Sequence, residues 1–368
     1  MHYHILLTEI CNGECRYCYK KSLQEFDNDL YKRFEFDFSS PEKSEINIEK
    51  LKAFLEKDKD GVLIFYGGEP LLEIEKIMEI IDNINCKFRM QTNGLLLDKL
   101  DIIYLNKITK VLVSIDGDKE RTDYNRAVGT FDKVINNIGL IRKKGYKGEI
   151  VARMTISEFP DIYEQVLNLI DSKLFDSYHW QLDAGFFKSD FDKEKFTKFV
   201  NEYNKSISKL IDFWISEMKK GRVLKIYPFL GIISSILNNE KTKLRCGAGH
   251  SGYAIATNGK IVACPIMNCL KDFEAGTLDS EIYDLKKFDV SGTCSYCKHL
   301  DLCGGRCLYW NKAGLWPDEG NELVCNTIKH LIDELLKRKE EINRLIKNGI
   351  IKKEDFDYEK YFGPEIIP

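Results

Sequence analysis

The chain has 368 residues, of which 43% are hydrophobic and 31% are charged, and its formal net charge is −3. This length allows one large domain with a smaller one, and the composition is that of a globular protein with a sizeable core. A nearly balanced charge excludes a global field that would attract nucleic acid or acidic lipid. No apolar run approaches the roughly 20 residues that span a bilayer. We therefore expect neither a nucleic-acid nor a membrane partner.

The first residues and the cysteines indicate the compartment. The start, Met1-His2-Tyr3-His4, lacks the basic residues and cleavage site of a secretory signal. It leads directly into an apolar run, so we expect a cytoplasmic protein with no separate domain before this run. Disulfides are rare in a reducing compartment, so clustered cysteines there indicate metal binding or catalysis. Of the twelve cysteines, only Cys86 stands apart, and we expect it to be a buried, inert thiol.

Short apolar runs alternate with amphipathic stretches over the first half of the chain. The expected strands are His4–Thr8, Val62–Tyr66, Cys86–Gln91, Lys110–Ile115, Glu149–Ile156 and Tyr178–Leu182. The expected helices lie near Ile48–Lys57, Leu71–Ile84, Leu96–Asn106, Phe131–Lys144 and Pro160–Leu174. This alternation predicts an α/β fold with βαβ units and a parallel sheet. Six such units predict a partial (β/α)6 TIM-like barrel, with its chemistry at the C-terminal ends of the strands.

The second half is expected to be helical, then cysteine-rich, then helical again. Apolar residues at three-to-four spacing predict helical core packing over Lys193–Asn239, and Asn326–Asn348 is amphipathic. The region between them has short turns and little periodicity, which is typical of a small domain organised by metal, because ligand bonds replace a hydrophobic core. The expected ranges are 1–190 for the barrel, 191–240 for a helical bridge, 241–326 for the cysteine-rich domain and 327–368 for a helix and tail.

Three cysteines, Cys11, Cys15 and Cys18, follow the first expected strand within eight residues. Three thiolates can hold three corners of a [4Fe–4S] cluster and leave one iron open to a small molecule. The alternatives are a zinc knuckle or a fourth ligand from elsewhere in the chain. Structural zinc usually uses four protein ligands with paired, two-spaced cysteines, and this loop offers neither locally.

Polar motifs follow the next strands. Two glycines in Tyr66-Gly67-Gly68-Glu69-Pro70 would let the backbone approach a ligand closely, and Glu69 offers a carboxylate to a cationic group. The third strand ends in Gln91-Thr92-Asn93-Gly94, and the fourth ends in Val113-Ser114-Ile115-Asp116-Gly117. On the fifth strand, Arg153 is a polar residue among apolar ones. Asp183 follows the sixth strand, where it is either a base facing the cavity or an exposed loop aspartate.

On these residues the chain resembles the radical S-adenosylmethionine (SAM) superfamily. The signature of that family is Cys-x3-Cys-x-aromatic-Cys after the first barrel strand, with Tyr17 in the aromatic position. The resemblance implies that the open iron is chelated by the amino and carboxylate groups of SAM. It also implies that an electron from the cluster breaks the sulfur–C5′ bond to give a 5′-deoxyadenosyl radical, which abstracts a hydrogen atom.

The same resemblance implies the cofactor contacts. They are Tyr17, Gly67, Gly68, Glu69, Asn93, Ser114, Asp116 and Arg153. Glu69 would meet the methionine ammonium and Arg153 the methionine carboxylate, although a salt-bridged barrel arginine is an alternative for Arg153. Asn125-Arg126 also resembles the family's loop after the fourth strand, with no role assigned to it.

A second group of cysteines has the spacing Cys-x12-Gly-x4-Cys, then Cys-x2-Cys-x5-Cys-x3-Cys, and then a final cysteine. This pattern resembles the seven-cysteine SPASM domain, which holds two auxiliary [4Fe–4S] clusters. By that resemblance Cys294, Cys297, Cys303 and Cys325 ligate the outer cluster, and Cys246, Cys264 and Cys307 hold the inner one. The inner cluster then has an open iron or takes Cys269 as its fourth ligand, with His250 a weaker candidate. A zinc ribbon is the alternative for the whole group.

SPASM-bearing radical SAM enzymes mostly modify peptides or proteins, by side-chain oxidation, cross-linking or decarboxylation. The resemblance therefore implies a peptide or protein substrate, three [4Fe–4S] clusters, SAM, and a reductant such as ferredoxin or flavodoxin. The helical segment Lys193–Asn239 is one candidate surface for recruiting the peptide. Two alternatives stay open, namely a radical SAM enzyme acting on a small metabolite and an iron–sulfur electron-transfer protein.

Overall fold

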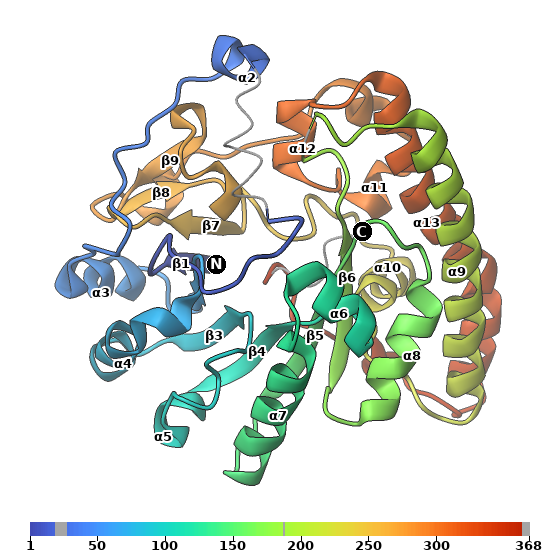
Figure 1. Ribbon diagram of the computed structural model, residues 1–368. Helices are drawn as coiled ribbons and strands as arrows, with labels where there is room; N and C mark the ends of the chain where they lie inside the picture. Colours follow the sequence, from blue (N-terminus) through green and yellow to red (C-terminus); the bar gives the residue numbers. More distant parts are fainter. Residues whose placement is uncertain (19–27, 187, 363–368) are drawn as a thin grey trace. The chain divides into compact units, whose positions relative to one another are not determined.

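The structure is a computed structural model that describes residues 1–18, 28–186 and 188–362 (Figure 1). Its contacts divide the chain into two compact units. Unit 1 comprises Met1–Arg153 and Gly247–Asp289, and unit 2 comprises Met154–Cys246 and the chain from Val290 onward. The two units cut across the four expected ranges, because residues 247–289 belong with the first half of the barrel.

Unit 1 is built on a parallel sheet. Its strands are β1 (His2–Leu6), β2 (Val62–Tyr66), β3 (Lys87–Thr92), β4 (Ile108–Ser114) and β5 (Glu149–Ile156), paired in the order β5-β4-β3-β2-β1. The run Val62–Phe65 is buried throughout, as expected for a strand covered on both faces. The helices are α2 (Asn28–Arg33), α3 (Ile48–Glu56), α4 (Ile74–Asn83), α5 (Ile102–Leu105), α6 (Lys119–Arg126) and α7 (Thr130–Lys143). The alternating order confirms the predicted α/β fold.

The cysteine-rich segment contributes strands to the same sheet. β7 (Gly252–Ile255) pairs in parallel with β1, and β8 (Lys260–Val262) and β9 (Glu274–Thr277) continue the sheet in antiparallel fashion. The sequence analysis predicted no strand in this segment. Strands of three or four residues are too short to give a recognisable period, and only their pairing with β1 reveals them.

Unit 2 consists mainly of helices. They are α8 (Ile162–Ser172), α9 (Lys193–Lys219), α10 (Tyr227–Asn238), α11 (Leu300–Cys303), α12 (Leu308–Ala313) and α13 (Asp318–Lys347). The unit also holds β6 (Ser177–Leu182), which follows β5 in the strand order of the partial barrel. The expected helical stretch after residue 193 is two helices, interrupted near Gly221, whose φ is +79°. The last helix begins at Asp318, so it includes Cys325.

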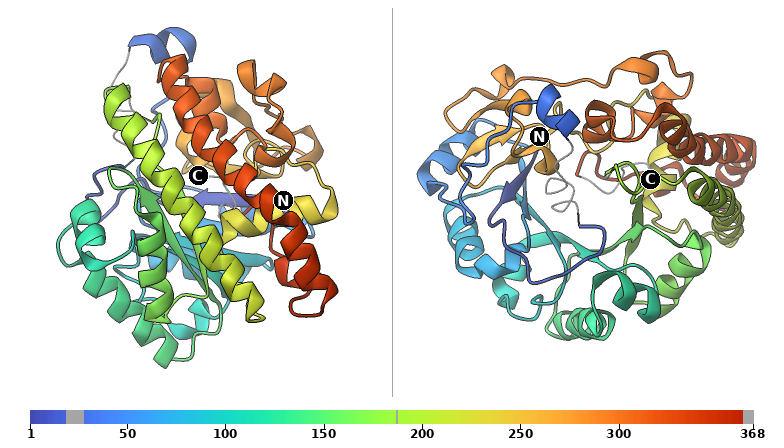
Figure 2. Two further views of the ribbon diagram at one scale, coloured as in Figure 1. Left: turned by 90° about the vertical axis from the view of Figure 1, so that its right-hand side faces the viewer. Right: turned by 45° about the horizontal axis from the view of Figure 1, so that its top comes forward.

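The long helices α9 and α13 lie side by side (Figure 2). Lys193 pairs with Glu319 near the two N-termini, and Lys219 pairs with Glu341 near the two C-termini. The helices therefore run in the same direction. Between these ends Ser208 Oγ and His330 Nε2 share a hydrogen bond of 2.9 Å. No helix in the described part of the chain is long and apolar enough to cross a bilayer.

Gly67 and Gly68, which follow β2, pack against the chain that leads to Cys11. The Gly68 N–H donates to the Thr8 carbonyl oxygen at 2.8 Å, and the Glu69 N–H donates to the Ile10 carbonyl oxygen at 2.9 Å. A Cβ at Gly68 would lie 2.1 Å from the Ile10 oxygen, and one at Gly67 would lie 2.3 Å from the Thr8 oxygen. The contact between the two strand ends therefore requires both glycines, independently of any role in binding a ligand.

This contact predicts opposite effects for two glycine-to-alanine changes in unit 1. Gly68→Ala should destabilise the protein by about 3 kcal/mol or more, because the clashing atom is backbone and cannot move aside cheaply. Gly139→Ala, in the interior of α7 with nothing within 4 Å of the added Cβ, should stabilise it by about 0.5–1 kcal/mol. Thermal melts of the two variants would show this. Equal Tm values would contradict the proposed packing.

Candidate cofactor and cluster sites

The front cysteines lie together on the loop after β1. The Gly13 N–H donates to Cys11 Sγ at 3.3 Å, and the Cys18 N–H donates to the Cys15 carbonyl oxygen at 3.2 Å. Burial raises the pKa of the Cys11 thiol, and the neighbouring Cys15 and Cys18 add to that rise. The three thiols are therefore close enough to act on one another, and none of the twelve cysteines, all of which lie in the described residues, forms a disulfide.

Within the described residues, no three His, Cys, Asp or Glu side chains converge tightly enough to hold a single metal ion. A [4Fe–4S] cluster makes a different demand, because each cysteine sulfur binds a different iron and the sulfurs stand apart. The front loop offers three thiols, with hydrogen-bond donors near the sulfurs of Cys11 and Cys15. Three thiolates of this kind fit three corners of such a cluster.

Glu69 connects the ends of β2 and β3. Its buried carboxylate accepts hydrogen bonds from Thr92 Oγ1 at 2.7 Å, the Asn93 N–H at 2.7 Å and the Leu71 N–H at 3.0 Å. Burial nevertheless raises the pKa of Glu69 to about 7. A carboxylate has about four lone-pair sites, so one more donor can be accommodated.

Asn93 carries this connection on to the cysteine loop. Its Nδ2 donates to Asn12 Oδ1 at 2.7 Å and lies 3.9 Å from Cys11 Sγ. The Leu95 N–H donates to Asn93 Oδ1 at 3.0 Å, which fixes the orientation of the amide. The predicted site residue Asn93 therefore lies at the Cys11–Cys18 loop, beside the first cysteine.

Asp116 and Arg126 hold the other side of the loop. Asp116, which is fully buried after β4, accepts hydrogen bonds from Arg126 Nε at 2.9 Å and Arg126 Nη2 at 3.0 Å. The Tyr17 hydroxyl also donates to Asp116 Oδ2. The third guanidinium nitrogen, Arg126 Nη1, lies 3.7 Å from Cys15 Sγ.

These contacts give two of the predicted cofactor residues, Tyr17 and Asp116, partners within the protein itself. They also identify a residue that the sequence analysis left without a role, Arg126. Asp116 follows β4 and Arg126 ends α6. Nothing in their spacing indicates that the guanidinium reaches back to Cys15, so only the three-dimensional structure shows this contact.

Ser114 and Arg153 face each other on adjacent strands. They are partners in the parallel register of β4 and β5. Burial lowers the pKa of His4 on β1 to about 3, and the charges of His2 and Arg153 add to that lowering.

The outer cysteines of the second group all belong to unit 2. Cys294, Cys297, Cys303 and Cys325 act on one another electrostatically, and burial raises the pKa of Cys303 to about 11. The backbone N–H groups of Gly305 and Arg306 point at the Cys303 sulfur, and Asn311 Nδ2 lies 3.6 Å from Cys294 Sγ. Four thiols in one unit, with donors near the sulfurs of Cys294 and Cys303, offer the ligand set of a fully ligated [4Fe–4S] cluster.

The inner group is divided between the units. Cys246 and Cys307 belong to unit 2, and Cys264 belongs to unit 1. Arg245 holds the segment before Cys246 in place, because its guanidinium donates to the Leu302 carbonyl oxygen at 2.6 and 2.9 Å.

Cys269 and Cys86 differ from the other cysteines. Cys269 is buried, and the charged groups that raise its pKa, after burial itself, are Glu9 and Asp37. Cys86 is half-buried rather than buried. Its pKa is raised to about 11 by burial, so the expectation of an unreactive thiol is compatible with its surroundings.

Asp183, directly after β6, is half-buried in unit 2. Burial raises the pKa of its carboxyl to about 7, and Asp190 adds to this rise while Arg306 opposes it. A pKa near neutrality suits a general base. Its backbone N–H donates to the Ile156 carbonyl oxygen at 2.8 Å, which fixes the residue at the strand end.

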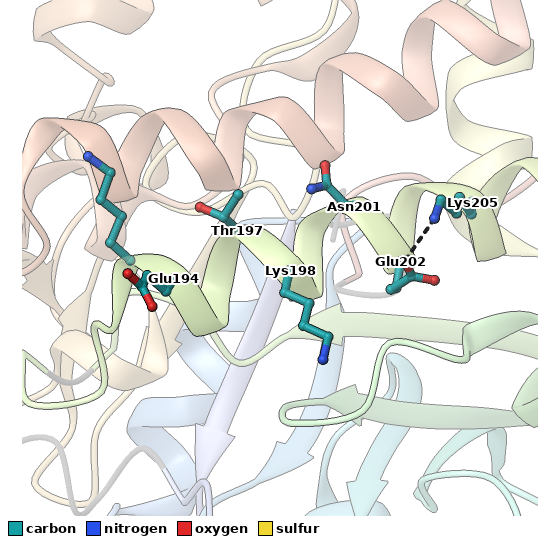
Figure 3. A pocket seen from close by; sticks show the side chains of 7 residues that line it. Glu194, Thr197, Lys198, Asn201, Glu202 and Lys205 are labelled. Carbon is teal, nitrogen blue, oxygen red and sulfur yellow. Dashed lines mark hydrogen bonds and ion pairs between the residues drawn. The ribbon is translucent and has the colours of Figure 1, made fainter.

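A hollow of about 800 Å³ lies over α9 (Figure 3). One helix supplies all of its lining, which consists of Lys193, Glu194, Thr197, Lys198, Asn201, Glu202 and Lys205. Lys205 is already paired with Glu202 at 2.8 Å. The hollow is an open, polar helix face without cysteine, so it is no cluster site.

Comparisons with known proteins agree with this arrangement. Residues 5–170 match the model of the Radical SAM superfamily. The chain is 26% identical over 362 residues to the cysteine-type anaerobic sulfatase-maturating enzyme of Clostridium novyi, covering 88% of this chain and 92% of the relative. It is 24% identical over 369 residues to the radical SAM cyclopropyl synthase TigE of Paramaledivibacter caminithermalis, covering 92% and 75%.

Solved structures share the fold. The structure of native anSMEcpe with bound AdoMet matches with a TM-score of 0.67 at 20% identity, covering 93% of this chain and 99% of that one. Streptococcus suis SuiB bound to its precursor peptide SuiA matches with a TM-score of 0.54 at 17% identity, covering 84% and 72%.

The Asp116–Arg126 pair predicts a large loss of stability when only one charge is removed. Asp116→Asn leaves a buried guanidinium without its counter-charge, which should cost about 3–5 kcal/mol. The matched control is Asp132→Asn, which breaks the exposed pair with Lys119 and should leave Tm unchanged. Thermal melts of the cluster-free proteins test this. Similar Tm values for the two variants would show that the buried pair does not hold the loop.

The raised pKa of Glu69 predicts a pH-dependent stability. The folded protein keeps this proton up to about pH 7, whereas the unfolded chain loses it near the ordinary value of 4.5. The stability that Glu69 contributes is therefore complete below pH 4.5 and is lost as the pH rises through about 7. Urea unfolding at several pH values should show a steeper fall in this window for the native chain than for Glu69→Gln. Parallel curves would contradict the raised pKa.

Proposed function

Residues 5–170 are a radical SAM domain, and we propose that the whole chain is a radical SAM enzyme that modifies a side chain of a peptide or protein. The observation that carries the proposal is the loop of three free thiols, held at the carboxyl ends of the strands by Asn93 and by Arg126. Active sites of barrel folds lie at this end of the strands.

Cys11, Cys15 and Cys18 would hold the [4Fe–4S] cluster of this domain. When bound, that cluster supplies the electron for reductive cleavage of SAM. The chain itself orients the ligands, since Asn93 approaches the Cys11 sulfur and Arg126 approaches the Cys15 sulfur. Hydrogen bonds and nearby cations at the sulfurs also tune the potential of such a cluster.

For SAM, we propose contacts with Glu69, Ser114 and Arg153. Glu69 has room for one further donor, such as an amino group, and Arg153 offers a guanidinium suited to a carboxylate. We propose a different role for Tyr17 and Asp116 than direct cofactor binding. Both are committed to the network that positions Arg126 against Cys15, and Gly67 and Gly68 provide the close approach of the two strand ends.

We propose two auxiliary [4Fe–4S] clusters in addition. Cys294, Cys297, Cys303 and Cys325 would ligate the outer one completely, and Cys246, Cys264 and Cys307 would hold the inner one. We propose an open iron on the inner cluster, with ligation by Cys269 as the alternative.

A peptide substrate is supported by the relatives. Two of them are named as cysteine-type anaerobic sulfatase-maturating enzymes, and a structural neighbour contains bound AdoMet and the Cp18Cys peptide. We propose Asp183 as the residue that accepts a proton during the reaction. We also propose a reducing, cytoplasmic setting, with ferredoxin or flavodoxin as electron donor, because such a setting keeps thiols reduced.

The first test is anaerobic reconstitution followed by iron and sulfide analysis and assay of 5′-deoxyadenosine with dithionite and SAM. We expect about twelve irons per chain, since each proposed cluster contains four, and formation of 5′-deoxyadenosine. Replacing Cys11, Cys15 and Cys18 by alanine should remove about four irons and abolish this product. Zinc in place of iron, or iron without SAM cleavage, would overturn the proposal.

Substrate class is tested with deuterated candidates. A peptide substrate deuterated at the reacting carbon should transfer deuterium into 5′-deoxyadenosine, and Asp183→Asn should reduce product formation without preventing SAM binding. Transfer from a deuterated nucleotide instead would favour the small-metabolite alternative, since the chain is also 33% identical over 143 residues to a GTP 3′,8-cyclase.

A further inference from the structure

The loop between Cys303 and Cys307 has an unusual backbone. Gly304, Gly305 and Arg306 are consecutive left-handed residues with φ of +76°, +94° and +56°. Glycine adopts this conformation at little cost, whereas a residue with a side chain pays roughly 1–2 kcal/mol. A third glycine would therefore suit position 306 better on local grounds, so the arginine side chain is present despite a backbone cost.

The Arg306 side chain is buried, with 4% of its surface exposed. Its guanidinium lies 5.3 Å from the centre of the Trp310 ring, and Nη2 donates to the Leu182 carbonyl oxygen at 3.4 Å. Its Nη1 has no hydrogen-bond partner. A buried cation with only one long hydrogen bond and one aromatic face is costly unless a negative group compensates it.

No carboxylate among the described residues forms an ion pair with Arg306. Arg306 opposes the rise in the pKa of Asp183, but the two side chains are not within ion-pair distance. Arg126 at the front loop is different, because Asp116 neutralises it. The groups that act most strongly on Arg306 are cysteine thiols: Cys307, which we propose for the inner cluster, and then Cys325 and Cys303, two of the four cysteines proposed for the outer cluster. Cysteines become anionic thiolates when they bind metal.

We propose that Arg306 supplies the buried positive charge that compensates the outer auxiliary cluster and raises its reduction potential. The inference rests on the proposed function, specifically on ligation of that cluster by Cys294, Cys297, Cys303 and Cys325. Reduction adds one electron and makes the cluster more negative. A fixed cation in a poorly solvated position stabilises the reduced form more than the oxidised form, and net charge near a cluster is one determinant of its potential.

The proposal also gives the strained loop a purpose. The left-handed turn directs the N–H groups of Gly305 and Arg306 at the Cys303 sulfur and keeps the Arg306 side chain inside unit 2. Both features favour added negative charge on the cluster. Arg306 therefore acts through the cluster as a positioning and charge-compensating residue, without contact with the substrate.

The test is an anaerobic redox titration, followed by electron paramagnetic resonance, of full-length protein in which Cys11, Cys15 and Cys18 are alanine. Adding Cys294→Ala to this protein identifies the outer cluster, because the redox transition that disappears belongs to it. Arg306→Gln should lower the reduction potential of the outer cluster. At a fixed applied potential, the ratio of oxidised to reduced cluster should rise at least tenfold, which corresponds to a shift of about 59 mV for one electron. Arg306→Lys should keep the potential of the parent.

Lys298→Gln is the matched control, because it removes one positive charge beside Cys297 from an exposed position, where water screens it. It should leave the potential unchanged. Loss of iron in Arg306→Gln together with retention in Arg306→Lys would support the proposal. An unchanged potential in Arg306→Gln, or loss of iron in both variants, would overturn it. If Cys294→Ala removes neither iron nor a couple, the proposed outer cluster itself is wrong.

Discussion

The structure depends on one constraint, namely that a loop without regular secondary structure must present three thiols in a fixed arrangement. The Cys11–Cys18 loop has almost no hydrogen bonds of its own. Its position comes from neighbouring strand ends, through Glu69 and Asn93 on one side and through Asp116 and Arg126 on the other. The second support is a buried ion pair and the first is a hydrogen-bond network around the buried Glu69, so each is strong only while all of its partners are present.

This dependence explains why the barrel strands end in polar motifs. The Gly67–Gly68 turn brings β2 against the chain before Cys11, and the carboxylate of Glu69 then reaches the end of β3. Residues expected to bind SAM thus have a second task, which is to align the strand ends. Tyr17 and Asp116 have this second task as well, through their contacts with each other and with Arg126.

The two arginines near cysteine sulfurs differ in their electrostatic setting. Arg126 is paired with Asp116, so the front loop receives a dipolar, nearly neutral group. Arg306 has no comparable carboxylate in the described structure and brings a net positive charge to the outer cysteines. Clusters with the same ligands can have very different reduction potentials when their surroundings differ in charge. In this chain the surroundings of the front cysteines and of the outer cysteines differ in charge in this way.

The sequence by itself determined the class of chemistry and most of the barrel. Cysteine spacing is local information, and so is an apolar run such as Val62–Tyr66 between helical stretches, which predicts a buried strand. Both can therefore be recognised without a structure. The short strands β7–β9, the split of the helical stretch into α9 and α10, and the contacts of Arg126 and Arg306 were decided by tertiary structure. Each of these depends on groups far apart along the chain, such as β1 with β7 or Cys15 with Arg126. Neither periodicity nor spacing records which distant groups meet, because that is set by how the whole chain packs.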